Sequence, residues 1–205
     1  MNENNILGVV LAGGKSKRVG QDKSQVKLGD KTLLEHTLSK LHLKFNKIVI
    51  VANKNINNNY TIINDCIEGQ LGPLVGVLSA MKWIEKNNYS YSWVATFPCD
   101  TPFFNISIIE EFKKISKLND NLLYFIKSKE RRHNIFGLWS LKLIETLEKD
   151  IVKNNFRKVE EWANKIGVKT IDAPNDHIDQ FFNINTKDDL IEAEKIFKNN
   201  KYDRL

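Results

Sequence analysis

The sequence predicts an α/β protein: a three-layer α/β/α sandwich around a Rossmann-like, mostly parallel sheet with an antiparallel part. Short apolar runs, typical of buried strands, alternate with longer segments whose apolar residues recur at helical spacing. Only at residues 122–139 do two strand-like runs follow each other without room for a crossover helix, so these two are expected to pair antiparallel. No internal repeat or Gly/Ser-rich linker divides residues 1–205, which predicts a single domain.

The first half of the chain begins with the apolar run ILGVVL at residues 6–11, as expected of a strand that is buried on both faces. Thr32 and Glu35 form a capping-box pattern that opens the first helix. Pro73 suits the first turn of a second helix, and Ser107 is expected to cap a third. Further strands are predicted at residues 47–52, 60–63 and 93–97.

The second half continues the alternation after the antiparallel pair. A polar segment separates the two strands of that pair. The elements expected in this half are strands at 122–126 and 135–139, helices at 141–152 and 156–166, a strand at 168–171, an extended stretch at 181–185 and a last helix opened by Thr186.

The composition is that of an ordinary globular protein, with 41% hydrophobic and 27% charged residues. The polar start lacks the layout of a signal peptide, and no apolar run approaches the roughly 20 residues that span a membrane. Only two cysteines occur, Cys66 and Cys99, so no disulfide or zinc framework is expected. The net charge is +6, but most lysines alternate with acidic residues and form no stripe. These features predict a cytoplasmic protein that contacts neither membranes nor nucleic acid.

A glycine turn rich in cations follows the first strand, in the stretch LAGGKSKRVGQDK at residues 11–23. Gly13 and Gly14 let the backbone turn and approach a ligand closely, and Lys23 is one of four cations that follow. Backbone N–H groups and cations together favour phosphate binding. The stretch matches neither the Walker pattern nor GxGxxG. The alternative is a surface turn with a solvated basic face.

Other polar residues follow later predicted strands. Asn53 comes after the second strand, and Asp100 after the fourth. Ligands bind at the carboxyl ends of strands in open α/β sheets, so these side chains are expected near Gly13 and Gly14. A carboxylate beside a phosphate loop suits Mg²⁺, which usually takes one or two carboxylates plus phosphate oxygens. Taken alone, an Asp after a strand is as often a turn residue or a helix cap.

Six motifs, in this order, resemble those of the molybdenum cofactor guanylyltransferases, and the similarity covers nearly the whole chain. The LAGG opening favours this family over cytidylyl-transferring relatives, which usually read LAAG. Two departures are visible, because Val19 stands where Met is usual and Asn134 where Pro is common. The motifs are LAGGKSKRVGQDK at 11–23, LLEH at 33–36, DCIEGQLGPLVG at 65–76, PCDTPFF at 98–104, RRHNIFGLW at 131–139 and NINT at 183–186.

The resemblance implies a nucleotidyltransferase-like fold and transfer of GMP from GTP to the terminal phosphate of molybdopterin. It implies a nucleotide-binding first half and an acceptor-binding second half, with Lys23 and Asp100 as catalytic residues and Mg²⁺ on Asp100. The nucleotide would contact residues of the first half, namely Leu11, Ala12, Gly13, Gly14, Lys23, Asn53, Asp65 and Asp100. The pterin would lie toward Arg132, Asn183 and Asn185.

Several alternatives stay open at this point. The chain could transfer a nucleotide to another phosphorylated acceptor, of the cytidylyl or sugar-phosphate type. It could also be a non-catalytic protein that binds a nucleotide or cofactor. A cofactor-delivery protein would be a further partner of the guanylyltransferase. Asn183 and Asn185 could instead belong to a capped turn before the last helix.

Overall fold

The computed structural model describes residues 5–13, 25–53, 56, 59–69, 71–118, 120–174 and 179–199. The strands are β1 (Ile6–Leu11), β2 (Lys27–Leu28), β3 (Lys31–Thr32), β4 (Ile48–Val51), β5 (Thr61–Ile63), β6 (Trp93–Pro98), β7 (Leu123–Ser128), β8 (Arg131–Ser140) and β9 (Lys169–Asp172). The helices are α1 (Leu33–His42), α2 (Pro73–Lys86), α3 (Ser107–Leu118), the 3₁₀-helix η2 (Leu141–Leu143), α4 (Ile144–Val152), α5 (Val159–Ile166) and α6 (Lys187–Asn199).

A seven-stranded sheet with the order β5-β4-β1-β6-β8-β7-β9 forms the middle layer. The neighbours β5, β4, β1 and β6 are all parallel. The strand β8 runs antiparallel to both β6 and β7, whereas β7 and β9 are parallel. The expected mostly parallel sheet with an antiparallel part is therefore confirmed.

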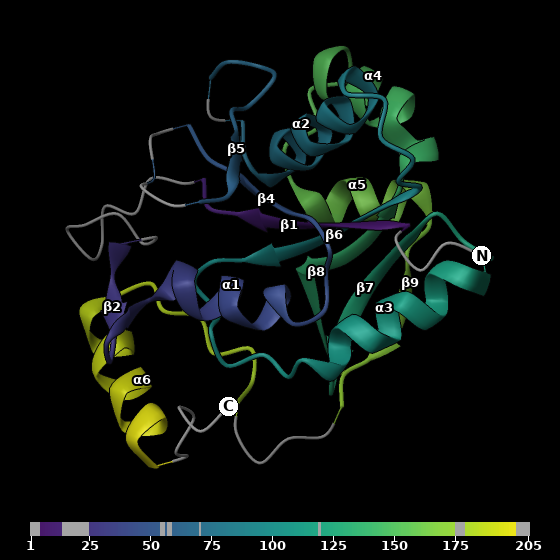
Figure 1. Ribbon diagram of the computed structural model, residues 1–205. Helices are drawn as coiled ribbons and strands as arrows, with labels where there is room; N and C mark the ends of the chain where they lie inside the picture. The colour runs from purple at the N-terminus through teal and green to yellow at the C-terminus, as the bar shows by residue number, and fades with distance from the viewer. Residues whose placement is uncertain are drawn as a thin grey trace.

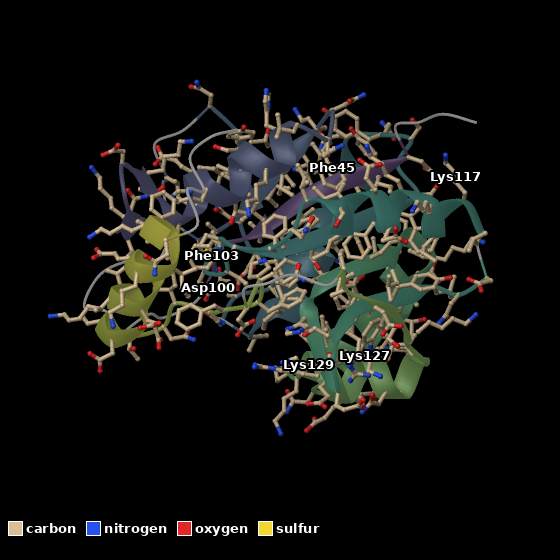
Figure 2. The ribbon with its side chains drawn as sticks, turned by 90° about the horizontal axis from the view of Figure 1, so that it is seen from below. Phe45, Asp100, Phe103, Lys117, Lys127 and Lys129 are labelled. Atoms are coloured by element: carbon tan, nitrogen blue, oxygen red, sulfur yellow. The ribbon has the colours of Figure 1, made fainter. Side chains whose placement is uncertain are left out.

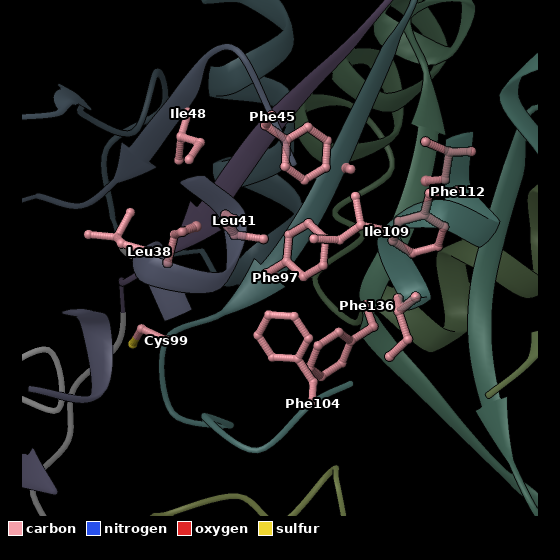
Figure 3. Close-up of a cluster of buried hydrophobic side chains, with 14 of the residues drawn as sticks. Leu38, Leu41, Phe45, Ile48, Phe97, Cys99, Phe104, Ile109, Phe112 and Phe136 are labelled. Atoms are coloured by element: carbon pink, nitrogen blue, oxygen red, sulfur yellow. The ribbon is translucent and has the colours of Figure 1, made fainter. Parts of the chain in front are cut away.

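Helices cover both faces of this sheet (Figure 1). The helices α1 and α3 pack on one face, where a cluster rich in phenylalanine fills the space between the layers (Figure 3). The helices α2, α4 and α5 cover the other face through a second apolar cluster. The last helix, α6, lies apart from these layers beside β2. The predicted three-layer sandwich is confirmed.

Two predicted helix starts are confirmed in atomic detail. The Thr32 hydroxyl accepts a hydrogen bond from the Glu35 N–H at 3.1 Å, and the Glu35 carboxylate accepts one from the Thr32 N–H at 2.6 Å. Pro73 is the first residue of α2, after Gly72 at φ +90°. The helix predicted to begin near Ser107 is present, but its predicted cap was wrong. Ser107 is the first residue of α3, and its N–H donates to the side chain of Asn105. Short polar side chains two residues apart can exchange this role.

The predicted bounds of the antiparallel pair were wrong, because most of the polar segment at 127–134 belongs to the two strands. The strand β7 continues to Ser128 and β8 begins at Arg131, so a two-residue turn joins them. Lys129 takes positive φ (+53°) in this turn. The pairing of the backbones overrides the weak strand preference of the charged side chains.

The remaining differences are small. The helix predicted at 141–152 begins with the 3₁₀-turn η2, and the one predicted at 156–166 begins only at Val159. The stretch at 181–185 forms no strand. Within the described ranges, no helix is long and apolar enough to cross a membrane.

Candidate functional site

Four parallel strands end level with one another at one edge of the sheet. In the register of the sheet, Leu11 of β1 pairs with Val51 of β4 and with Pro98 of β6. Val51 in turn pairs with Ile63 of β5. The residues two positions beyond this line are all predicted nucleotide ligands: Gly13, Asn53, Asp65 and Asp100. The register thus brings together residues that are up to 87 positions apart in the sequence.

Asn53 and Asp65 are bonded to each other across the ends of β4 and β5. The Asn53 side-chain amide donates to Asp65 Oδ2 at 2.6 Å, and its carbonyl oxygen accepts from the Asp65 N–H at 2.8 Å. These two bonds fix the orientation of the Asp65 carboxylate, and both side chains lie at the surface. A fixed, accessible carboxylate is suited to accept hydrogen bonds from a ligand.

The start of the glycine turn is held close to the sheet. The Ala12 N–H donates to the Val51 carbonyl at 3.0 Å, and Ala12 is buried. Gly13 is exposed, and a Cβ atom built on it would have no described atom within 4 Å. The described residues therefore leave room beside Gly13 for a ligand. Gly14 and Lys23 lie outside the described residues.

The chain leaves the glycine turn through a small apolar cluster that also holds the acceptor segment, which we define as residues 183–185. The Leu33 N–H donates to the Val26 carbonyl at 2.9 Å and closes the turn around the hairpin of β2 and β3. The cluster joins the residues around β2 to the loop after β6 and to α6. Its buried members are Val26, Leu28, Leu33, Phe103, Ile184 and Ala193.

Asp100 lies directly against the acceptor segment. The Ile184 N–H donates to the Asp100 backbone carbonyl at 2.9 Å. The Thr101 hydroxyl lies 3.4 Å from Asp100 Oδ1, within reach of a weak hydrogen bond. Figure 2 shows Asp100 and Phe103 next to α6 and the segment that precedes it. Residues predicted to bind the two substrates therefore meet here, because Asn183 and Asn185 flank the buried Ile184.

The capped-turn interpretation of the acceptor segment holds for its backbone. The Asp189 carboxylate accepts from the N–H groups of Asn185 and Thr186 at 2.8 Å each, and the Thr186 hydroxyl accepts from the Asp189 N–H at 3.1 Å. The bond from Asn185 to this cap uses its backbone N–H. A role of the two asparagine side chains in acceptor binding stays a prediction.

Arg132 lies on the α5 side of the sheet. Its Nε donates to Asn134 Oδ1 at 2.7 Å, and its Nη2 lies 3.9 Å from the Glu160 carboxylate on α5. The guanidinium also lies 5.8 Å from the centre of the Phe125 ring. Together with residues of the β7–β8 hairpin and β9, these groups line an open hollow of about 770 Å³. None of these contacts joins Arg132 to the acceptor segment, and its predicted role stays untested.

His133, the next residue, faces the chain leading into the acceptor segment. Its ring stacks on Phe181 with centroids 3.7 Å apart, and its Nε2 lies 2.6 Å from Ser128 Oγ. Burial, helped by the nearby charge of Arg131, lowers the pKa of His133 to about 4, although Asp179 opposes this. The sequence offered no signal for this contact. His133 belongs to no metal-ligand pattern, and the face of the sheet on which its side chain lies depends on how β8 pairs.

Comparisons with known proteins show the family to which the chain belongs. Residues 8–166 match the family described as the MobA-like NTP transferase domain. A molybdenum cofactor guanylyltransferase of Rhizobium rhizogenes is 34% identical, over 91% of this chain and 89% of that protein. One of Nitrobacter hamburgensis is 30% identical, over 92% of this chain and 93% of that protein. The chain belongs to the molybdenum cofactor guanylyltransferase family. As a member of the MobA-like NTP transferases, it is a nucleotidyltransferase.

Solved structures agree in fold with this MobA-like chain. Molybdopterin-guanine dinucleotide biosynthesis protein A from Archaeoglobus fulgidus superposes with a TM-score of 0.79 and 23% identity, covering 94% of this chain and 99% of that chain. The 4-diphosphocytidyl-2C-methyl-D-erythritol synthase of Anaerococcus prevotii gives a TM-score of 0.70 with 13% identity, covering 96% and 100%. At these identities the likeness shows the fold alone. The fold therefore does not separate guanylyl from cytidylyl transfer.

Proposed function

We propose that this protein transfers GMP from GTP to the terminal phosphate of molybdopterin and releases pyrophosphate. The observation that carries the proposal is the level line of Gly13, Asn53, Asp65 and Asp100, with the acceptor segment bonded to the backbone of Asp100. Donor and acceptor groups are then expected to meet at Asp100. The relatives of the same family carry the name of this reaction.

The reaction is a displacement at the α-phosphorus of GTP. An oxygen of the acceptor phosphate forms a bond to this phosphorus, while the bond to the bridging oxygen of the β-phosphate breaks and pyrophosphate leaves. The attacking oxygen is already an anion and needs no strong base, so the protein contributes mainly position and charge compensation. We assign charge compensation to Lys23 and to the N–H groups of the glycine turn, which would hold the departing phosphates.

The residues around Asp100 fit a Mg²⁺ ion held partly by its substrate. Within the part of the chain that the structure describes, no group of three or more His, Cys, Asp or Glu side chains is arranged so that it could hold a metal ion. A single carboxylate, Asp100, matches the way Mg²⁺ is often bound, through one or two carboxylates and the phosphates of a nucleotide. When bound, the ion would offset phosphate charge and polarise the α-phosphate. Asp100 is the residue we propose to hold it.

The other predicted ligands are assigned to GTP. The Asp65 carboxylate, fixed by Asn53, would accept hydrogen bonds from N–H or O–H groups of the nucleoside. Leu11 to Gly14 would let the triphosphate approach the backbone. We also propose a cytoplasmic location, since GTP is a cytoplasmic nucleotide and the chain carries only two cysteines.

A substrate matrix tests this proposal. Each of the four ribonucleoside triphosphates is incubated with the protein and magnesium, with molybdopterin, with a sugar phosphate or with no acceptor, and pyrophosphate release is measured. Release from GTP that depends on molybdopterin is the expected result. Preference for CTP or activity only with a sugar phosphate would identify another acceptor class. GTP binding in calorimetry without turnover on any acceptor would identify a carrier protein instead.

A further inference from the structure

The loop that carries Asp100, residues 99–106, has no regular secondary structure of its own. It begins where β6 ends at Pro98 and finishes where α3 starts at Ser107. Its carbonyl groups do not take part in the hydrogen bonds of a sheet, and buried carbonyl groups need other hydrogen-bond donors. Phe103 and Phe104 are both buried, so the loop is anchored in the core and its backbone cannot rely on water alone.

Lys40 supplies partners for this backbone from α1. Its Nζ donates to the carbonyl of Pro102 at 2.7 Å and to the carbonyl of Phe104 at 2.7 Å. The same ammonium group lies 4.8 Å from the centre of the Phe104 ring. One turn earlier in α1, the Thr37 hydroxyl lies 3.5 Å from the Pro98 carbonyl. The helix therefore contacts the backbone just before the loop, at Pro98, and within the loop, at Pro102 and Phe104.

The C-terminal part of the chain holds other backbone groups of the same loop. Gln180, which is buried, accepts from the Asn105 N–H at 3.1 Å. Ile184 donates to the Asp100 carbonyl, as described above. Lys40 and the acceptor segment thus bond different carbonyl groups of one short loop. Charge-assisted hydrogen bonds such as those from Lys40 are roughly twice as strong as neutral ones, so their loss would leave the loop less well defined.

We propose that Lys40 is a positioning residue, whose ammonium group clamps the carbonyls of Pro102 and Phe104 and so fixes Asp100 at the end of β6. This inference rests on the proposed function, in which Asp100 acts at the phosphates. An error of about 1 Å in the position of a catalytic group can cost on the order of 100-fold in rate. A residue outside the six sequence motifs would therefore control turnover through the geometry of the loop.

Three single variants of the full chain test the proposal. Lys40→Met keeps most of the aliphatic stem and removes the charge, whereas Lys40→Arg keeps both charge and donors. Lys44→Met is the matched control. The Lys44 ammonium, just after α1, pairs with Glu110 of α3 at 2.8 Å and makes no contact of this kind with the loop at 99–106. Amide hydrogen exchange of residues 99–106 and of Ile184 is measured in each, together with thermal unfolding and the kcat and KM of guanylyl transfer.

The expected result is selective for Lys40→Met. Exchange in the loop and at Ile184 should accelerate at least about tenfold when compared at equal distance below each variant's melting temperature. The value of kcat should fall at least about tenfold while KM for GTP stays within about threefold. Lys40→Arg should keep both properties within about threefold of wild type, and Lys44→Met should leave them unchanged.

Two results would overturn the inference. In the first, Lys40→Met shows the same loop exchange and the same kcat as Lys44→Met, which would make Lys40 an ordinary structural contact. The other is equal loss in Lys40→Met and Lys40→Arg. If the wild-type protein itself fails to transfer GMP, the proposed function falls, but the exchange measurement still decides whether Lys40 fixes the loop.

Discussion

The two regions that we propose to bind the substrates, the nucleotide side and the acceptor side, are built in different ways. The nucleotide side consists of the ends of β1, β4, β5 and β6, where parallel pairing keeps the residues level. The acceptor side combines β8, which runs antiparallel, with the segment before α6, which belongs to no sheet. Regular pairing fixes the first region, whereas single contacts fix the second.

An irregularity in β8 shows what this difference means for individual side chains. Phe125 of β7 pairs with Gly137, but the next residue, Ile126, pairs with His133. One step along β7 thus corresponds to four along β8, and residues 134–136 have no partner on β7. Such a bulge changes the direction of the side chains that follow it.

The odd number of extra residues exchanges the two faces. Phe125 and Trp139 pack together on the α5 side, with ring centroids 5.1 Å apart. Regular alternation from Trp139 would put Arg132 on the opposite face, toward the acceptor segment. Because of the bulge, Arg132 lies toward α5 and His133 stacks on Phe181. The acceptor side therefore cannot be predicted by counting along the strand.

The largest effect is expected at Asp100, where the two regions meet. Asp100→Asn keeps the shape of the side chain and removes its charge, so turnover should fall at least about 100-fold because the proposed Mg²⁺ loses its carboxylate. GTP binding without metal should change much less. Asp120→Asn, at a remote carboxylate paired with Lys169, is the control and should behave like wild type. Normal turnover in Asp100→Asn would contradict the metal assignment.

Lys23→Met tests the nucleotide side alone. If Lys23 compensates charge that grows on the departing phosphates, kcat should fall on the order of 10- to 100-fold and KM for GTP should rise. Lys27→Met, at an exposed position in β2, serves as the control. A change confined to the melting temperature would support the alternative that the glycine turn is a surface turn without a ligand.

The acceptor side is tested by replacing both Asn183 and Asn185 with Ala. Their amide groups suit the polar ring edges of a pterin, so molybdopterin should bind about tenfold more weakly. The Ile184 N–H bond to Asp100 uses only backbone atoms, so the dissociation constant for GTP should stay within about threefold. Calorimetry with each ligand separately measures both. Equal weakening of the two ligands would mean that the segment only supports the fold.

The smallest effect on activity is expected at His133, which instead makes the stability of the fold depend on pH. Its pKa is about 4 in the folded protein, where burial disfavours the charged form, and near 6.5 when unfolded. Between these values the unfolded chain binds more protons, so stability should fall as the pH drops from 6.5 toward 4. Urea unfolding of wild type and His133→Gln from pH 7.5 to 4.5 measures this, and the variant should show the shallower decline.

The buried carboxylate Asp150 does not obscure that difference. Burial raises the pKa of Asp150, but hydrogen bonds from Lys165, Asn154 and Trp162 outweigh it and hold the pKa below its usual value. Asp150 therefore stays ionised throughout this range in both proteins. Parallel declines in wild type and His133→Gln would show that burial does not hold His133 neutral in the folded protein.

Much of the nucleotide side could be predicted because its determinants are local. The apolar run at residues 6–11 predicts a strand, and the polar residues Asn53 and Asp100 each follow directly after an apolar run. Parallel pairing of neighbouring strands then places those ends at one edge, as found. The cap contributed by Asn105 and the contacts of Lys40 were missed, because each joins segments whose approach depends on packing.

The sequence by itself determined the layered α/β architecture and the set of residues at the ends of β1, β4, β5 and β6. Alternating apolar periodicity decides which face of each element is buried, and this information lies within a few residues. Only the tertiary structure decided that Arg132 faces α5, that His133 stacks on Phe181, and that Ile184 lies against Asp100. These contacts depend on a bulge and on a segment outside the sheet, where no periodic pattern fixes the direction of a side chain.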